Sequence, residues 1–153
     1  MKKGILLIIT AVIFFSCSDK QLFIVKDGKS DYSIVIPENA DSLTLKAANE
    51  LQKYIKTSTG ALLPVTTVND PEYVGKKILV GIKPEENIKT LPDEIWHVNK
   101  AKLLFIGGGN GKSTLYSVYS FLEKYAGVRF LTPEAEIVPE NKDLIICKHL
   151  DYR

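Results

Sequence analysis

One continuous segment, Leu103–Phe130, constrains the fold of this chain more than any other. It reads LLFIGGGNGKSTLYSVYSFLEKYAGVRF, in which an apolar run typical of a buried strand meets a glycine turn. Beyond the turn, Ser113 can cap a helix and Gly127 can end it in a left-handed conformation. The segment therefore predicts a strand, a tight turn, an amphipathic helix and the start of another strand. One face of that helix carries the apolar residues Leu115, Val118, Tyr119, Leu122, Tyr125 and Ala126.

The glycine turn has part of the pattern of a phosphate-binding loop, but not its spacing. That loop needs a glycine, four further residues and then Gly-Lys-Ser/Thr, so that backbone amides surround a phosphate. Gly111-Lys112-Ser113 supplies the second half, but Ile106 stands where the first glycine is required. A dinucleotide pattern that starts at Gly107 would need glycine where Lys112 stands. We therefore expect no nucleotide and no other cofactor.

A second helix is expected earlier in the chain. Asp41 or Ser42 can begin it and Gly60 can end it, with the apolar residues between them on one face. Short runs rich in β-branched and aromatic residues, bounded by Gly, Pro or Asn, predict strands around the two helices. We expect an α+β domain, in which a mixed β-sheet carries two main helices on one face. The strand candidates are Phe23–Val25, Tyr32–Ile36, Val65–Val68, Ile78–Val80, Ile95–Val98, Leu103–Ile106 and Leu144–Ile146.

Several motifs follow one another along roughly Leu22 to Ile146 and together carry a resemblance to a known family. They are Ala47–Ile55, Thr59-Gly60, Leu63-Pro64-Val65, Ile78–Gly81, Gly107-Gly108, Thr114–Glu123, Gly127–Phe130 and Pro133-Glu134. In this order they resemble the N-terminal domain of α-glucuronidases and the related non-catalytic domain 2 of β-N-acetylhexosaminidase-like enzymes. The family often has Arg-Gly where this chain has Asn110-Gly111-Lys112, so a ligand role of that arginine is not carried over.

The resemblance implies a hexosaminidase domain 2-like fold of zincin-like topology without metal, and no catalytic residue in this chain. In the family such a domain packs against a (β/α)8 barrel that holds the catalytic acids. A short segment ending in an aromatic residue and an arginine, as at Tyr152-Arg153, leads into that barrel. A barrel needs about 200 residues by itself, so this chain of 153 residues does not hold one. We expect the domain over 22–147 and the start of a linker to the absent barrel over 148–153.

The N-terminal residues indicate the cellular location of the protein. Lys2-Lys3 is followed by the apolar run Gly4–Phe15, which is shorter than the ~20 residues of a spanning helix and typical of a secretory signal. Phe14-Phe15-Ser16-Cys17 resembles the end of a bacterial lipoprotein signal. We expect a signal peptide over 1–16, lipid attachment at Cys17, a tether over 17–21 and a lipid anchor in the bacterial cell envelope, at the outer membrane or periplasmic face. The alternative is an ordinary signal peptide with an incidental cysteine.

Charge and residue counts exclude several functions. Removing 1–16 takes two of the 20 bases, Lys2 and Lys3, and leaves 18 against 18 acids, without the basic face that a nucleic acid needs. The chain has two histidines, His97 and His149, in no zinc-binding spacing, so we expect no metal. If Cys17 is acylated, Cys147 has no disulfide partner.

Five residues are candidate contacts for a glycan or for the barrel: Trp96, Asn110, Lys112, Tyr116 and Arg129. An exposed Trp96 would give a flat face for a sugar ring, and the alternative is a tryptophan of the core. The turn Asn110–Lys112 and Tyr116 would lie near such a sugar. No pair of catalytic carboxylates is assigned, because the acids stand in turns after proline, as in Pro84-Glu85-Glu86, or on helix surfaces.

Two classes of function remain. The first is a non-catalytic accessory domain of a carbohydrate-active lipoprotein, which packs against a catalytic barrel in cis or in trans. On this interpretation an exposed apolar face meets the barrel. The second is a free-standing, membrane-tethered glycan-binding module. A nucleotide-dependent enzyme ranks behind both.

Overall fold

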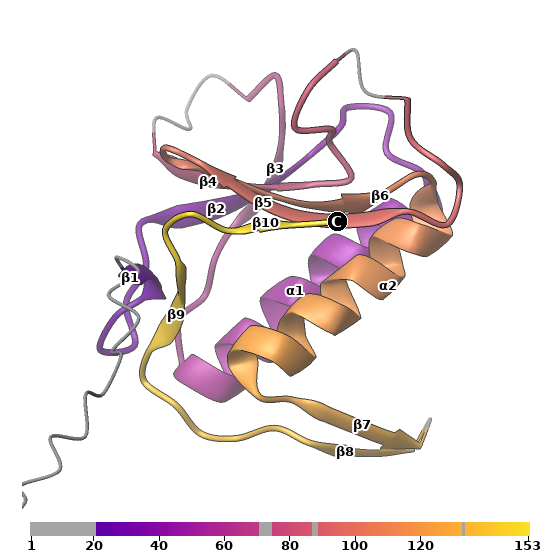
Figure 1. Cartoon of the computed structure of the whole chain (residues 1–153). Helices are drawn as coiled ribbons and strands as arrows, with labels where there is room; N and C mark the ends of the chain where they lie inside the picture. Colours follow the sequence, from indigo (N-terminus) through magenta and orange to yellow (C-terminus); the bar gives the residue numbers. More distant parts are fainter. Residues whose placement is uncertain (1–20, 71–74, 87–88, 133) are drawn as a thin grey trace, which may run out of the picture.

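The computed structural model describes residues 21–70, 75–86, 89–132 and 134–153 (Figure 1). The predicted signal peptide, the lipid site Cys17 and the tether up to residue 20 lie outside the described residues. Within the described part of the chain, no helix combines the length and the apolar character that crossing a membrane requires.

A six-stranded mixed sheet forms the centre of the domain, in the order β10-β5-β6-β4-β2-β3 (Figure 1). Neighbours among β3, β2, β4 and β6 are parallel, whereas β5 is antiparallel to β6 and β10 is antiparallel to β5. The predicted α+β class with a mixed sheet is therefore confirmed. The strands are β2 (Tyr32–Ile36), β3 (Val65–Thr67), β4 (Lys76–Val80), β5 (Ile95–Lys100), β6 (Leu103–Gly108) and β10 (Asp151–Tyr152).

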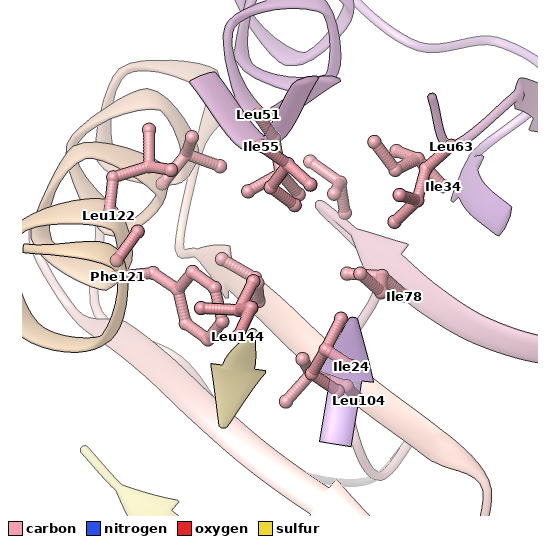
Figure 2. Packing of buried hydrophobic residues seen from close by; sticks show 14 of the residues in the cluster. Ile24, Ile34, Leu51, Ile55, Leu63, Ile78, Leu104, Phe121, Leu122 and Leu144 are labelled. Atoms are coloured by element: carbon pink, nitrogen blue, oxygen red, sulfur yellow. The ribbon is translucent and has the colours of Figure 1, made fainter. Parts of the chain in front are cut away.

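Two helices, α1 (Ser42–Thr59) and α2 (Gly111–Phe121), lie side by side on one face of this sheet (Figure 1). The second continues as a π-helical turn, η1 (Leu122–Ala126). The main core fills the space between the helices and the sheet, where Leu51 of α1, Phe121 of α2 and Ile78 of β4 are fully buried (Figure 2). Burying each such side chain contributes about 1.5–3 kcal/mol.

A separate antiparallel pair, β1 (Gln21–Val25) and β9 (Leu144–Cys147), closes one end of this core with Ile24 and Leu144 (Figure 2). A hairpin, β7 (Arg129–Thr132) and β8 (Ala135–Ile137), follows the helices and reaches away from the sheet (Figure 1). Neither β8 nor β10 was among the strands expected from the sequence. The predicted linker start, 148–153, includes β10, which pairs with β5.

The ends of α1 match the sequence prediction. The Asp41 carboxylate accepts a hydrogen bond from the Thr44 amide at 2.7 Å, and Gly60 ends the helix in the left-handed region at φ +80°. Gly127 likewise ends η1 at φ +73°. The predicted cap of α2 was wrong: the cap is Asn110, whose Oδ1 accepts from the Ser113 amide at 2.9 Å. Ser113 lies inside the first turn, and its hydroxyl donates to the Pro92 carbonyl instead.

Replacing Asn110 by alanine is expected to lower the free energy of unfolding by about 1 kcal/mol, because the Ser113 amide loses its acceptor. Urea denaturation of the variant and of the parent chain measures the difference. Asn141→Ala, at an exposed position outside both helices, is the matched control. Equal losses from the two substitutions would contradict the capping role.

Candidate functional site

Other atoms of the chain occupy the space beside the glycines of the turn between β6 and α2. A Cβ on Gly108 would stand 2.4 Å from the Ser113 Cβ, and a Cβ on Gly109 would stand 1.9 Å from the Leu91 carbonyl oxygen. The Gly108 amide donates to the Thr114 hydroxyl at 3.2 Å. These glycines are therefore required for the close approach of the strand, the helix and the 91–92 backbone.

Three of the five predicted contact residues come together at the N-terminus of α2. Lys112 and Tyr116 line a pocket of about 350 Å³ with Asp93, and the Lys112 ammonium lies 5.8 Å from the centroid of the Tyr116 ring. Tyr116 is 57% exposed. Asn110 caps the same helix.

The other two predicted contact residues lie elsewhere. Trp96 is only 2% exposed and packs in a second cluster on the sheet face opposite the helices, with its ring 3.0 Å from the position of a Cβ on Gly107. The tryptophan therefore belongs to the core, and its ring gives no exposed face to a sugar. Arg129 is exposed on β7 and pairs with Ile137 across the hairpin.

A larger pocket, of about 410 Å³, lies where α1 and α2–η1 meet the β7–β8 hairpin, and it was not predicted from the sequence. Its walls carry rings from three elements. Phe130 stands edge-on to Tyr54 at 5.2 Å and to Tyr119 at 4.8 Å between ring centroids. The lining residues are Tyr54, Tyr119, Glu123, Phe130, Leu131, Thr132 and Glu136. We call this set the aromatic–carboxylate pocket.

Glu136 connects the hairpin to α1. It accepts a hydrogen bond from the Tyr54 hydroxyl, and the Lys53 ammonium lies 3.6 Å from its Oε1. Burial, followed by this hydrogen bond and the Glu136 charge, raises the pKa of Tyr54 far above its usual value. Burial and the charges of Glu50 and Glu136 also raise the pKa of Tyr119. Both tyrosines are therefore neutral donors beside carboxylates at physiological pH.

A buried histidine lies on the other side of α2. His97 of β5 is fully buried, its Nε2–H donates to the Ser117 carbonyl at 2.9 Å, and Tyr152 of β10 stacks on its ring at 5.2 Å. The Ser117 hydroxyl in turn donates to the Trp96 carbonyl at 3.1 Å. These bonds fix α2 to the central sheet and give His97 a structural role.

Comparison with protein-family models finds no match to this chain, and comparison with the curated proteins finds none either. Over the described ranges, no three residues of the His, Cys, Asp and Glu types lie close enough together to hold a metal ion. Cys147 is a free thiol of intermediate exposure at the end of β9.

Proposed function

We propose that this chain is the non-catalytic accessory domain of a carbohydrate-active, glycoside hydrolase-like envelope lipoprotein, and that it packs against a catalytic (β/α)8 barrel in cis or in trans. The proposal includes the finer fold assignment, a hexosaminidase domain 2-like arrangement of zincin-like topology. The ordered motifs from Ala47 to Glu134 support it, as does the mixed sheet with two helices on one face that the resemblance implies.

The observation that carries the proposal is the exposed apolar surface of the β7–β8 hairpin. Leu131 is 62% exposed and Ile137 is 55% exposed, on strands of four and three residues. A two-stranded hairpin is marginally stable in water by itself. The apolar side chains of this hairpin, which extends beyond the helices (Figure 1), are typical of a surface that another protein covers.

The size of the native protein tests this proposal. Extracts of the source cells are fractionated and probed with an antibody raised against residues 21–153. A membrane-bound species several times larger than the 17.1 kDa of this chain supports a barrel in cis, and a species near 17.1 kDa that co-purifies with a glycoside hydrolase supports one in trans. A soluble cytosolic species near 17.1 kDa would contradict both.

A free-standing glycan-binding module is the second candidate, favoured by the pocket at the N-terminus of α2. There Tyr116 presents an exposed ring beside the charged groups of Lys112 and Asp93. A membrane-bound species near 17.1 kDa without a partner would favour this function. Binding of a defined oligosaccharide that Tyr116→Ala abolishes would then support it, and indifference of the full chain to a glycan panel would contradict it.

A further inference from the structure

The aromatic–carboxylate pocket has an unusual balance of charge. Two of its lining residues, Glu123 and Glu136, are acids, and none of the described residues that line it is basic. Lys53 approaches Glu136 from the rim but has a side chain that is 56% exposed. A third carboxylate, Glu50, acts electrostatically on both Tyr54 and Tyr119. The pocket therefore favours a positively charged occupant.

Its hydrogen-bonding groups point to the same kind of occupant. Carboxylates only accept hydrogen bonds, and the Tyr54 hydroxyl already donates its one hydrogen bond to Glu136. Sugar hydroxyls both donate and accept, and an anion only accepts. A guanidinium or ammonium group only donates, so its needs match those of the carboxylates in this pocket.

The chain itself provides an example of this chemistry at the rim. The Lys53 ammonium lies 4.5 Å from the centroid of the Tyr54 ring and 3.6 Å from Glu136, in contact with both an aromatic ring and a carboxylate. Arginine makes such cation–π contacts more often than lysine does. Lys53 is not among the lining residues of the pocket, whose volume of about 410 Å³ is open to a further cation beside Tyr119, Phe130 and Glu123.

We propose that the aromatic–carboxylate pocket receives an arginine or lysine side chain from the surface of a partner protein. The inference rests on the proposed function, since it requires a partner that docks on the β7–β8 hairpin. Leu131 is 62% exposed and gives this pocket an apolar border. A cation held between rings and carboxylates within such a border has the anatomy of an interface hot spot.

In the test, the full chain is titrated with the peptide acetyl-Leu-Arg-Leu-amide at low ionic strength. Binding is monitored by the NMR chemical shifts of the backbone amides of Tyr54, Phe130 and Glu136. The same peptide with citrulline in place of arginine keeps the shape and removes the charge. We expect the arginine peptide to bind at the pocket and the citrulline peptide to bind about tenfold more weakly, because charge-assisted hydrogen bonds are lost.

Two variants and a matched control locate the site. Glu123→Gln and Glu136→Gln each remove one negative charge. Each is expected to weaken the binding of the arginine peptide by about threefold to tenfold. Glu140→Gln, at an exposed position outside this pocket, leaves binding unchanged. Circular dichroism spectra equal to that of the parent chain establish that the variants fold.

Equal binding of the two peptides, or shifts confined to other residues, would overturn the inference. A glucose oligomer that binds here more tightly than the arginine peptide would overturn it too, by showing that the pocket takes a sugar. Neither result depends on the size of the native protein. The accessory-domain proposal can therefore stand if this one fails, and the two failures are distinguishable.

Discussion

Alanine in place of Gly108 is expected to lower the free energy of unfolding by about 3 kcal/mol, the upper end of the usual cost of overpacking. The added methyl carbon would stand 2.4 Å from the Cβ and 2.5 Å from the carbonyl carbon of Ser113. Ser113 cannot move away easily, because Asn110 holds its amide and Pro92 accepts from its hydroxyl. Urea denaturation at pH 7 measures the loss.

Gly60→Ala is the control for this substitution. Gly60 has φ +80°, but a Cβ there would meet no atom within 4 Å. Alanine at that position therefore adds only the strain of a left-handed residue, about 1–2 kcal/mol. A loss at Gly108 no larger than the loss at Gly60 would show that the strand–helix contact is loose, contrary to the packing described above.

Acidification from pH 7 to pH 4 is expected to remove about 3 kcal/mol of stability through His97 alone. Burial lowers the pKa of His97 from 6.5 to about 4, and the hydrogen bond to Ser117 opposes this shift only in part. Below pH 6.5 the unfolded chain binds a proton at His97, whereas the folded chain binds one only as the pH approaches 4. The contribution is therefore complete above pH 6.5 and is lost as the pH falls toward 4.

The pH dependence of unfolding in a His97→Phe variant isolates this effect from that of the carboxylates. Phenylalanine retains a ring among Phe121, Tyr125 and Tyr152 but has no proton to bind. Its stability should fall less steeply between pH 6.5 and 4 than that of the parent chain. His149→Asn, at the other, exposed histidine, is the matched control. Parallel curves for His97→Phe and the parent would refute the assignment.

Periodicity in the sequence predicted the parts of the fold that a buried face determines. The strand at Tyr32–Ile36 has the predicted bounds, and α1 begins and ends at the predicted residues, because burial and capping act locally there. The strand, turn and helix around the triple glycine were predicted as well. Asn110, directly before Gly111-Lys112, was not recognised as the cap, since Ser113 also has a capping side chain.

The candidate sites were predictable only in part. Lys112 and Tyr116 lie one helical turn apart, so their shared pocket follows from helix geometry alone. The aromatic–carboxylate pocket joins Tyr54 to Glu136 across 82 positions of the chain. Tyr54 and Tyr119 were predicted only as members of core faces, and no periodic pattern marked β8 as the partner of β7. The apolar ring of Trp96 was consistent with either burial or exposure, and its packing with Leu79, Val98 and Phe105 across the sheet decided between them.

The π-helical turn η1 has a consequence for how this domain tolerates changes in its length. Each residue of an α-helix advances the chain by about 100° around the helix axis, and a π-helical turn accommodates more residues than an α-helical one. Deleting one residue between Leu122 and Ala126 would turn η1 into an ordinary α-helical turn and leave the chain after Gly127 at nearly the same angle around that axis. Phe130 would then still face Tyr54 and Tyr119, whereas a deletion within α2 would swing it away from them. Homologues that lack one residue in η1 should therefore share both the fold and the pocket.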